Sequence, residues 1–224
     1  MTKYIIFDSG SLINITQNGL IEIFKTLAKD FQGEFLITPA VKYETIEHPL
    51  QIKKFEWGAL RIQQLLEEGV IKLVDEQNIV SRKELDKKTE ELLNKVNNVF
   101  FTWNKSIKLI ERGETESLAL SLMLKEKGID SAVSIDERTA RMICEDLDKL
   151  KTLMESKLHT KIKMKYNLPE LKKVKILRST EIMYAAYQKG IMSKERQTLE
   201  AILYALKFGG CSISEKEIDL MKKA

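Results

Sequence analysis

Five acidic residues of this chain could do chemistry together. Two of them directly follow short apolar segments, and three stand near the beginning of helical patterns. Carboxylates gathered in one cleft repel one another, so they stay ionised chiefly when a cation lies among them. A ligand set made only of oxygen favours a hard divalent ion, Mg²⁺ or Mn²⁺, which polarises a phosphate oxygen and lowers the pKa of a bound water. The five candidates for such a metal site are Asp8, Glu44, Glu114, Glu116 and Asp136.

Four of these acids also have a purely structural interpretation, which the sequence leaves open. Glu114 and Glu116 would complement the dipole of a helix in its first turn, where acidic residues are favoured. Glu44 would be an ordinary solvent-facing residue of a helix. Asp136 would cap the helix that follows it in the chain.

Short apolar strands alternate with helical patterns through most of the chain, and this alternation predicts the framework that would hold the acids. It is typical of parallel βαβ units, so the predicted fold class is α/β: a three-layer α/β/α sandwich with a central parallel sheet and a helical C-terminal extension. The carboxyl ends of parallel strands share one edge of a sheet, so Asp8 and Asp136 should meet there. The expected strands are 3–7, 35–37, 70–74, 132–135 and 174–177, and the expected helices are 20–31, 39–48, 52–68, 115–127, 137–159, 180–189 and 194–208, with a short one after Ser214.

The composition excludes several other kinds of protein. The 224 residues are 43% apolar and 31% charged, which is ordinary for a globular protein and too apolar for a disordered one. The longest apolar runs fall far short of a membrane span and the N-terminus is unlike a signal peptide, so we expect no membrane partner and a cytoplasmic location. Two cysteines and two histidines suit neither a disulfide framework nor structural zinc. A P-loop and a dinucleotide-binding glycine motif are both missing from the sequence.

The net charge of +4 conceals a strong asymmetry along the chain. Residues 1–148 carry 20 Lys and Arg against 25 Asp and Glu, whereas 149–178 carry nine lysines and Arg178 against two glutamates. An acidic body with a basic arm predicts an anionic partner for the arm. The alternation from Lys161 to Lys165 suits an edge strand that lays charges along a phosphate backbone, although lysines also guard exposed edges against aggregation. The candidate nucleic-acid contacts in this arm are Lys157, Lys161, Lys163 and Lys165.

Four segments surround the candidate acids with distinctive neighbours. They are Phe7-Asp8-Ser9-Gly10-Ser11-Leu12-Ile13, then Thr38-Pro39 through Glu44, then Gly113-Glu114-Thr115-Glu116-Ser117-Leu118-Ala119-Leu120-Ser121, and finally Ser134-Ile135-Asp136-Glu137-Arg138-Thr139-Ala140-Arg141. In this order they resemble the motifs of PIN-domain ribonucleases, a family that includes the toxins of toxin–antitoxin pairs and relatives with a helical C-terminal extension. The resemblance covers about residues 3–147 and extends loosely into the tail.

This resemblance implies a metal-dependent endoribonuclease that hydrolyses RNA phosphodiesters with Mg²⁺ or Mn²⁺. The metal carboxylates of the family fall on Asp8, Glu44, Glu114 and Asp136 of this chain. Glu114 takes the third place because it lies seven residues before Ser121, as the acid of the family precedes the small residue of its helix. Glu116 would be an accessory acid, and the other four would be the catalytic residues.

The resemblance also implies partners and a domain organisation. RNA would be the substrate, while an antitoxin partner and a homodimer stay open. Arg138 and Arg141 would contact phosphate, or alternatively pair with Glu145 and nearby acids. The family has Ser or Thr where this chain has Gly10, so a supporting hydroxyl would come from Ser9 or Ser11, or be missing. The expected parts are a PIN-like catalytic domain at 1–147 with a charged helical insertion at 81–111, a basic arm at 148–178 and a helical extension at 179–224.

Two alternatives share the same sequence features. The chain could be a PIN-like scaffold that binds RNA or a protein through an inactive acidic site. It could also be a structure-specific DNA nuclease with the same metal centre, because nothing in the sequence resembles a reader of the 2′-hydroxyl group.

Overall fold

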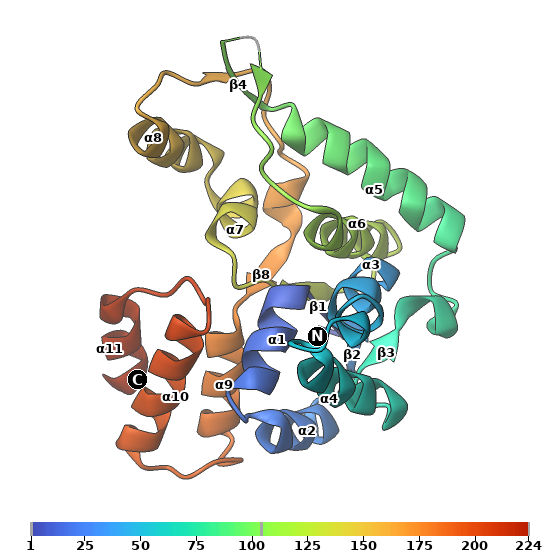
Figure 1. Ribbon diagram of the computed structural model, residues 1–224, viewed down its shortest axis with the longest axis vertical. Helices are drawn as coiled ribbons and strands as arrows, with labels where there is room; N and C mark the ends of the chain where they lie inside the picture. Colours follow the sequence, from blue (N-terminus) through green and yellow to red (C-terminus); the bar gives the residue numbers. More distant parts are fainter. Residues whose placement is uncertain (1, 104, 224) are drawn as a thin grey trace.

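The computed structural model describes residues 2–103 and 105–223. Its centre is a five-stranded sheet whose neighbouring strands all run parallel, in the order β3-β2-β1-β6-β8 (Figure 1). Helices cover both faces of this sheet, so the chain is an α/β protein built in three layers, as the alternation of strands and helices predicts. The strands are β1(Tyr4–Phe7), β2(Glu34–Ile37), β3(Lys72–Leu73), β6(Ser131–Ser134) and β8(Lys175–Leu177).

The central strand β1 is covered on both faces. Tyr4 and Ile6 belong to one hydrophobic cluster, whereas Ile5 and Phe7 pack with the other. Alternate residues of a strand point to opposite faces, so a strand that is covered on both sides has to be apolar throughout. This is why β1 reads as an unbroken apolar run, and why its first polar neighbour, Asp8, stands where the strand ends.

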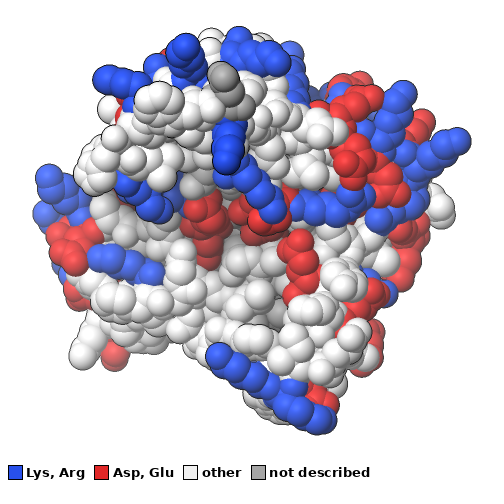
Figure 2. Space-filling model, turned by 45° about the horizontal axis from the view of Figure 1, so that its top comes forward, with Lys and Arg blue, Asp and Glu red and all other residues white. Residues whose placement is uncertain are grey.

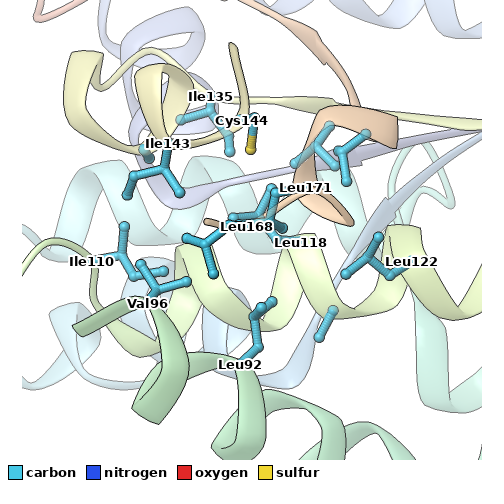
Figure 3. Packing of buried hydrophobic residues seen from close by; sticks show 14 of the residues in the cluster. Leu92, Val96, Ile110, Leu118, Leu122, Ile135, Ile143, Cys144, Leu168 and Leu171 are labelled. Atoms are coloured by element: carbon cyan, nitrogen blue, oxygen red, sulfur yellow. The ribbon is translucent and has the colours of Figure 1, made fainter. Parts of the chain in front are cut away.

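Helices from the middle of the chain cover one face of the sheet. The first layer is α6, which contacts β1 and β6, and α5 packs across α6. Figure 3 shows Leu92 and Val96 of α5, Leu118 of α6 and Leu168 gathered in one apolar core. The elements on this side are α5(Arg82–Asn97), α6(Arg112–Glu126), α7(Arg138–Glu145), α8(Leu147–Leu158) and the short turn η4(Leu171–Lys173).

The other face is covered by helices from both ends of the chain. The C-terminal helix α9 contacts α1 and α2, α10 packs on α9, and α11 packs on α10. Their apolar side chains belong to the same cluster as Phe7, so the C-terminal extension shares a core with the sheet. The helices on this side are α1(Ser9–Gln17), α2(Ile21–Asp30), α4(Glu56–Glu67), α9(Ser179–Gln188), α10(Arg196–Phe208) and α11(Glu215–Lys223).

Helix α1 begins directly after β1, at a place where the sequence suggests only a capped turn. Three polar residues of this helix, Ser11, Asn14 and Thr16, are buried. Buried polar side chains hide the apolar period by which an amphipathic helix is recognised. Each of them forms hydrogen bonds inside the protein, which removes the cost of burial.

The predicted helical insertion at 81–111 is helical only in its first half. After α5 the chain forms β4(Phe100–Thr102) and β5(Lys105–Ser106), which pair antiparallel. The strand β7(Lys163–Met164) pairs antiparallel with the other side of β4, so it is an edge strand of a small three-stranded sheet. The alternation of lysines and apolar residues in the basic arm therefore predicts its edge strand. The strand β4 is not predicted, because its two phenylalanines are surrounded in the sequence by charged residues of helical type.

Two helical predictions differ in detail. The helix expected over 137–159 is divided between α7 and α8 at Asp146, whose backbone is extended and whose side chain caps α8 by accepting the N–H of Lys149 at 2.9 Å. The helix expected from Pro39 does run to Pro49, but only its first turn is α-helical. This segment consists of α3(Pro39–Lys42), the π-helical turn η1(Tyr43–Glu47) and the short turn η2(Pro49–Gln51), and η3(Val74–Gln77) follows β3.

Candidate metal centre

Asp8 ends β1 and is the N-cap residue of α1. Its backbone N–H donates to the carbonyl of Ser134 at 3.0 Å, and its side chain accepts the N–H of Gly10 at 3.1 Å. The residue is only 5% exposed. Burial raises the pKa of its carboxyl to about 7; the hydrogen bond from Gly10 opposes this rise, and the charges of Glu44 and Asp136 add to it. Asp8 is therefore a buried acid whose ionised form is disfavoured.

Glu44 reaches Asp8's end of the sheet from the π-helical turn after α3. Its Oε2 accepts the hydroxyl of Ser9 at 2.5 Å, and its Oε1 accepts the N–H of Gly113 at 3.2 Å. A Cβ atom at residue 113 would overlap the carboxylate of Glu44, so the Glu44 side chain keeps this position only with glycine there. Glu44 thus ties together the segments that follow β1 and β2 and the start of α6. Of the two serines beside Gly10, Ser9 donates its hydroxyl to Glu44, whereas Ser11 donates to the backbone carbonyls of Asp8 and Ser134.

Glu114 belongs to the first turn of α6. Its Oε2 accepts the N–H of Glu111 at 3.0 Å, which caps the helix. Burial, together with the charges of Asp8, Glu137 and Glu44, raises the pKa of its carboxyl to about 8. The structure therefore brings Asp8, Glu44 and Glu114 into one electrostatically coupled group, at the carboxyl ends of β1 and β2 and the start of α6.

Glu116 makes its contacts elsewhere. Its side chain is fully buried, and Oε2 accepts the N–H of Ala40 at 2.6 Å at the start of α3. The other oxygen, Oε1, lies 3.6 Å from a guanidinium nitrogen of Arg82 on α5. Residues two apart in a helix point about 200° from each other. The structure accordingly separates Glu116 from the contacts of Glu114, and it uses Glu116 to fasten α3 and α5 to α6.

Asp136 is surrounded by hydrogen-bond donors. Its Oδ1 accepts the N–H of Ser179 at 2.8 Å, and its Oδ2 accepts the hydroxyl of Ser179 at 2.7 Å and the side-chain amide of Asn14 at 2.8 Å. The backbone carbonyl of Asp136 also accepts the N–H of Ser212 at 3.0 Å. Asp136 does cap a helix, but this helix is α9 from the C-terminal extension. The helix that follows it, α7, is capped by Glu137.

The two candidate arginines have different environments. Arg138 is exposed at the start of α7. Arg141 is largely buried; its Nη1 donates to the carbonyl of Ser212 at 2.9 Å, and its Nε lies 3.8 Å from Glu145. The pairing with Glu145 that the sequence allows is therefore present, and Arg141 additionally holds the loop after α10.

The lysines of the basic arm lie apart from the acids. Lys157 is near the end of α8, and Lys161, Lys163 and Lys165 are exposed in and around β7, while Ile162 between them is buried. The ammonium group of Lys165 lies 5.7 Å from the centre of the Phe101 ring on β4. Figure 2 shows a face of the molecule on which acidic side chains occupy the middle, with lysine and arginine side chains above them.

The donor set suits a hard divalent cation. Asp8, Glu44 and Glu114 offer only oxygen atoms, which Mg²⁺ and Mn²⁺ prefer. Raised pKa values at Asp8 and Glu114 are what neighbouring buried carboxylates show without a counter-charge, and a cation among them would reverse the shift. Within residues 2–103 and 105–223, however, no three His, Cys, Asp or Glu side chains are arranged closely enough to hold one ion together. Binding would require the side chains of the group to rotate towards a common point.

Asn14 and Ser179 are residues that the sequence gives no reason to select. Both are buried, and both bind Asp136. At the carboxylate group, Gly113 is a signal that the sequence does contain. It directly precedes Glu114, and because it lacks a side chain it leaves room for Glu44.

Comparisons of the chain with protein-family models, with curated proteins and with solved structures give no match. In the part of the chain that the structure describes, each helix is too short or too polar to cross a lipid bilayer.

Proposed function

We propose that this protein is a metal-dependent endoribonuclease of the PIN-domain type, which hydrolyses RNA phosphodiesters with Mg²⁺ or Mn²⁺. The observation that carries the proposal is the group formed by Asp8, Glu44 and Glu114. These acids come from three separate segments, and their charges act on one another at the carboxyl edge of a parallel sheet, where α/β proteins place their ligands. The order of the sequence motifs around these acids is the reason for proposing the PIN-domain type.

In this proposal Asp8, Glu44 and Glu114 hold the ion through carboxylate oxygens. When bound, the ion supplies Lewis-acid chemistry: it lowers the pKa of a water molecule and neutralises charge on the phosphate. Ser9 and the N–H of Gly113 orient Glu44 by occupying one lone pair on each of its oxygens. Burial of Asp8 limits competition from bulk water and strengthens its attraction for a cation.

Asp136 has a different part in this proposal. Its oxygens already accept hydrogen bonds from Ser179 and Asn14, while its charge still acts on Asp8. We therefore assign it mainly to positioning the loop after β6 and to adding negative potential to the site. Residues that contact the ligands of a metal, and not the metal itself, tune the properties of the metal without replacing a ligand.

The basic arm supports RNA as the substrate class. Three exposed lysines follow one side of β7, and such a row gives affinity for a phosphate backbone without reading sequence. Arg138, which is exposed beside the acids on α7, is placed to add a phosphate contact. The family resemblance leaves an antitoxin partner and a homodimer open, and the composition of the chain is the reason for proposing a cytoplasmic location.

The decisive experiment combines cleavage with metal binding. Purified wild type, Asp8→Asn, Glu114→Gln and Glu116→Gln are incubated with end-labelled single-stranded RNA or DNA, in Mn²⁺ or in EDTA. We expect Mn²⁺-dependent cleavage of RNA by wild type and by Glu116→Gln, and strong loss in the other two variants. Titration of free Mn²⁺, followed by its paramagnetic resonance signal, should show binding to wild type and weaker binding to Asp8→Asn.

The same reagents test the alternatives. Cleavage in EDTA, or full activity of Asp8→Asn, would overturn the metal-nuclease proposal. Binding of RNA without cleavage in Mn²⁺ would identify an inactive scaffold, and cleavage confined to DNA would identify a DNA nuclease.

A further inference from the structure

A pocket of about 570 Å³ adjoins the carboxylate group on the α1 side of the sheet. It lies between α1, the turns η1 and η2, and α4, and Glu44 forms part of its lining. The helices α1 and α4 contact each other beside it. Glu44 is therefore shared between the candidate metal centre and this pocket, so a molecule bound in the pocket would lie next to the acids.

The pocket has an aromatic lining that is open to solvent. Trp57 is 72% exposed and Phe55 is 45% exposed, although both line the pocket. Ile13, Ile52 and Ile62 complete an apolar surface. Large exposed aromatic side chains next to a cavity are typical of surfaces on which planar ligands stack.

Two cations of the same lining are free to bind an anion. Lys54 lies 5.2 Å from the centre of the Phe55 ring, and Arg61 is one helical turn beyond Trp57 on α4. In the described ranges 2–103 and 105–223, neither has a carboxylate within ion-pair distance, whereas the adjacent Lys53 is paired with Glu56 at 2.9 Å. Unpaired cations beside an apolar surface suit a ligand that is both planar and negatively charged.

Gln17 at the end of α1 adds an exposed polar side chain to the lining. Its amide can donate to and accept from the edge of a base. The hydroxyls of Thr16 and Thr45, which also belong to the lining, donate to backbone carbonyls one turn earlier. A volume of this size lies within the roughly 300–1,000 Å³ that small-molecule pockets occupy.

We propose that this pocket binds an unpaired nucleobase of the RNA strand that is cleaved at the adjacent acids. The base stacks on Trp57 and Phe55, and Lys54 and Arg61 contact the flanking phosphates. A base in a duplex cannot enter a pocket, so this arrangement makes the protein selective for single-stranded or unpaired RNA. The inference rests on the proposed function, because the strand is defined as the substrate of the metal centre.

The test uses Trp57 as its own reporter. In a Trp103→Phe, Asp8→Asn background Trp57 is the only tryptophan and cleavage is suppressed. We expect a single-stranded oligouridine RNA to quench its fluorescence and the same strand in a duplex to leave it unchanged. Replacing the uridines of this strand by abasic sites should remove most of the quenching.

Binding constants then give the size of the effect. In the Asp8→Asn background, Trp57→Ala should weaken single-stranded RNA binding by about 5- to 150-fold, the range that stacking of one base gives. Phe208→Ala is the matched control, because Phe208 is also an exposed aromatic (81%) and lies outside the pocket. Lys54→Gln with Arg61→Gln should weaken binding and flatten its salt dependence.

The outcomes separate this inference from the proposed function. Unchanged affinity in Trp57→Ala, or equal losses for duplex and single strand, would overturn the base pocket even if wild type cleaves RNA. Preferential binding of an apolar peptide would overturn it in favour of protein docking. Quenching by single-stranded RNA together with a loss in Trp57→Ala would support the pocket even if no metal-dependent cleavage occurs.

Discussion

Asp8 and Asp136 follow adjacent strands at the same edge of the sheet, yet their surroundings differ. Each comes close after a strand, β1 or β6, and these two strands are hydrogen-bonded neighbours. Asp8 accepts one backbone N–H and faces other acids, and its pKa is raised to about 7. Asp136 accepts bonds from Ser179 and Asn14 on both of its oxygens.

The difference shows that a strand-end acid can serve chemistry or architecture according to what covers it. The N-terminus of α9 supplies donors to Asp136, and such donors stabilise a buried carboxylate. Asp8 caps its own helix, α1, and accepts the N–H of Gly10, but burial and the charges of Glu44 and Asp136 outweigh this hydrogen bond and disfavour its ionised form. A cation would lower the electrostatic energy much more at Asp8 than at Asp136, so the two residues should respond differently to substitution.

The largest expected effect is on catalysis. Asp8→Asn should lower the rate of RNA cleavage by on the order of a hundredfold or more, because it removes a charged ligand while keeping the shape of the side chain. Asp136→Asn should lower it by roughly ten- to a hundredfold, the range for residues that support a metal ligand. Rates at saturating Mn²⁺ measure both, and equal losses would place Asp136 among the ligands.

Glu114 and Glu116 sharpen the comparison within one helix. Glu114→Gln should cost far more activity than Glu116→Gln, because only Glu114 shares the electrostatic field of Asp8. Single-turnover cleavage rates decide the order. A larger loss for Glu116→Gln would show that the metal lies nearer to the start of α3.

Substitutions of the two aspartates should change the stability of the protein in opposite directions. Asp136→Ala should lower the free energy of unfolding by roughly 2–4 kcal/mol, because it removes the acceptor of one N–H of the buried Asn14 amide and of both the N–H and the hydroxyl of Ser179. Asp8→Asn should raise the Tm of the metal-free protein at pH 8, with each kcal/mol worth roughly 2–4 °C.

Thermal unfolding in EDTA measures these stabilities, with Asp148→Ala as the control, since Asp148 is exposed at the start of α8. Destabilisation by Asp8→Asn at pH 8 would contradict the repulsion on which the comparison rests.

The pH dependence of stability follows from the burial of these two carboxyls, Asp8 and Glu114, and from the repulsion between them and their acidic neighbours. Folding raises the pKa of Asp8 from 3.8 to about 7 and that of Glu114 from 4.5 to about 8. At a pH between the unfolded and the folded pKa of each group, the folded state binds more protons than the unfolded state. The contribution of these groups to the free energy of unfolding is therefore greatest below about pH 4 to 5, and it is lost as the pH rises towards 8.

The Tm of the metal-free wild type, measured from pH 5 to 8, should therefore contain a falling contribution that is absent from an Asp8→Asn, Glu114→Gln double variant. Saturating Mn²⁺ should remove the same contribution from wild type. An identical pH profile in the double variant would argue against charge repulsion in the group.

The smallest effect concerns the basic arm, which lies apart from both aspartates. Changing Lys161, Lys163 and Lys165 to Gln should reduce the slope of log K against log salt for single-stranded RNA by about 2, or about 0.7 per lost phosphate contact. The cleavage rate at saturating RNA should hardly change. A control with Lys29, Lys83 and Lys216 changed to Gln keeps the net charge equal, and an unchanged slope in the arm variant would assign these lysines to edge protection.

The sequence predicts the framework well because its signals are local. Unbroken apolar runs such as Tyr4–Phe7 mark strands that are covered on both faces, and the alternation of strands and helices then leaves few topologies open. The sequence does not reveal α1, because Asn14 and its polar neighbours are satisfied by residues far away in the chain. Nor does it reveal β4, whose partner β7 lies about 60 residues later.

By itself, the sequence determined the parallel sheet, the place of Asp8 and Asp136 at its carboxyl edge, and the exposed lysines of β7. Only the tertiary structure decided which acids share a group. Glu114 and Glu116 are separated by the rotation of one helix, and Asp136 is occupied by Ser179, 43 residues further along the chain. Hydrogen-bond partners of a buried carboxylate depend on chain segments that meet only on folding, and sequence spacing does not record those meetings.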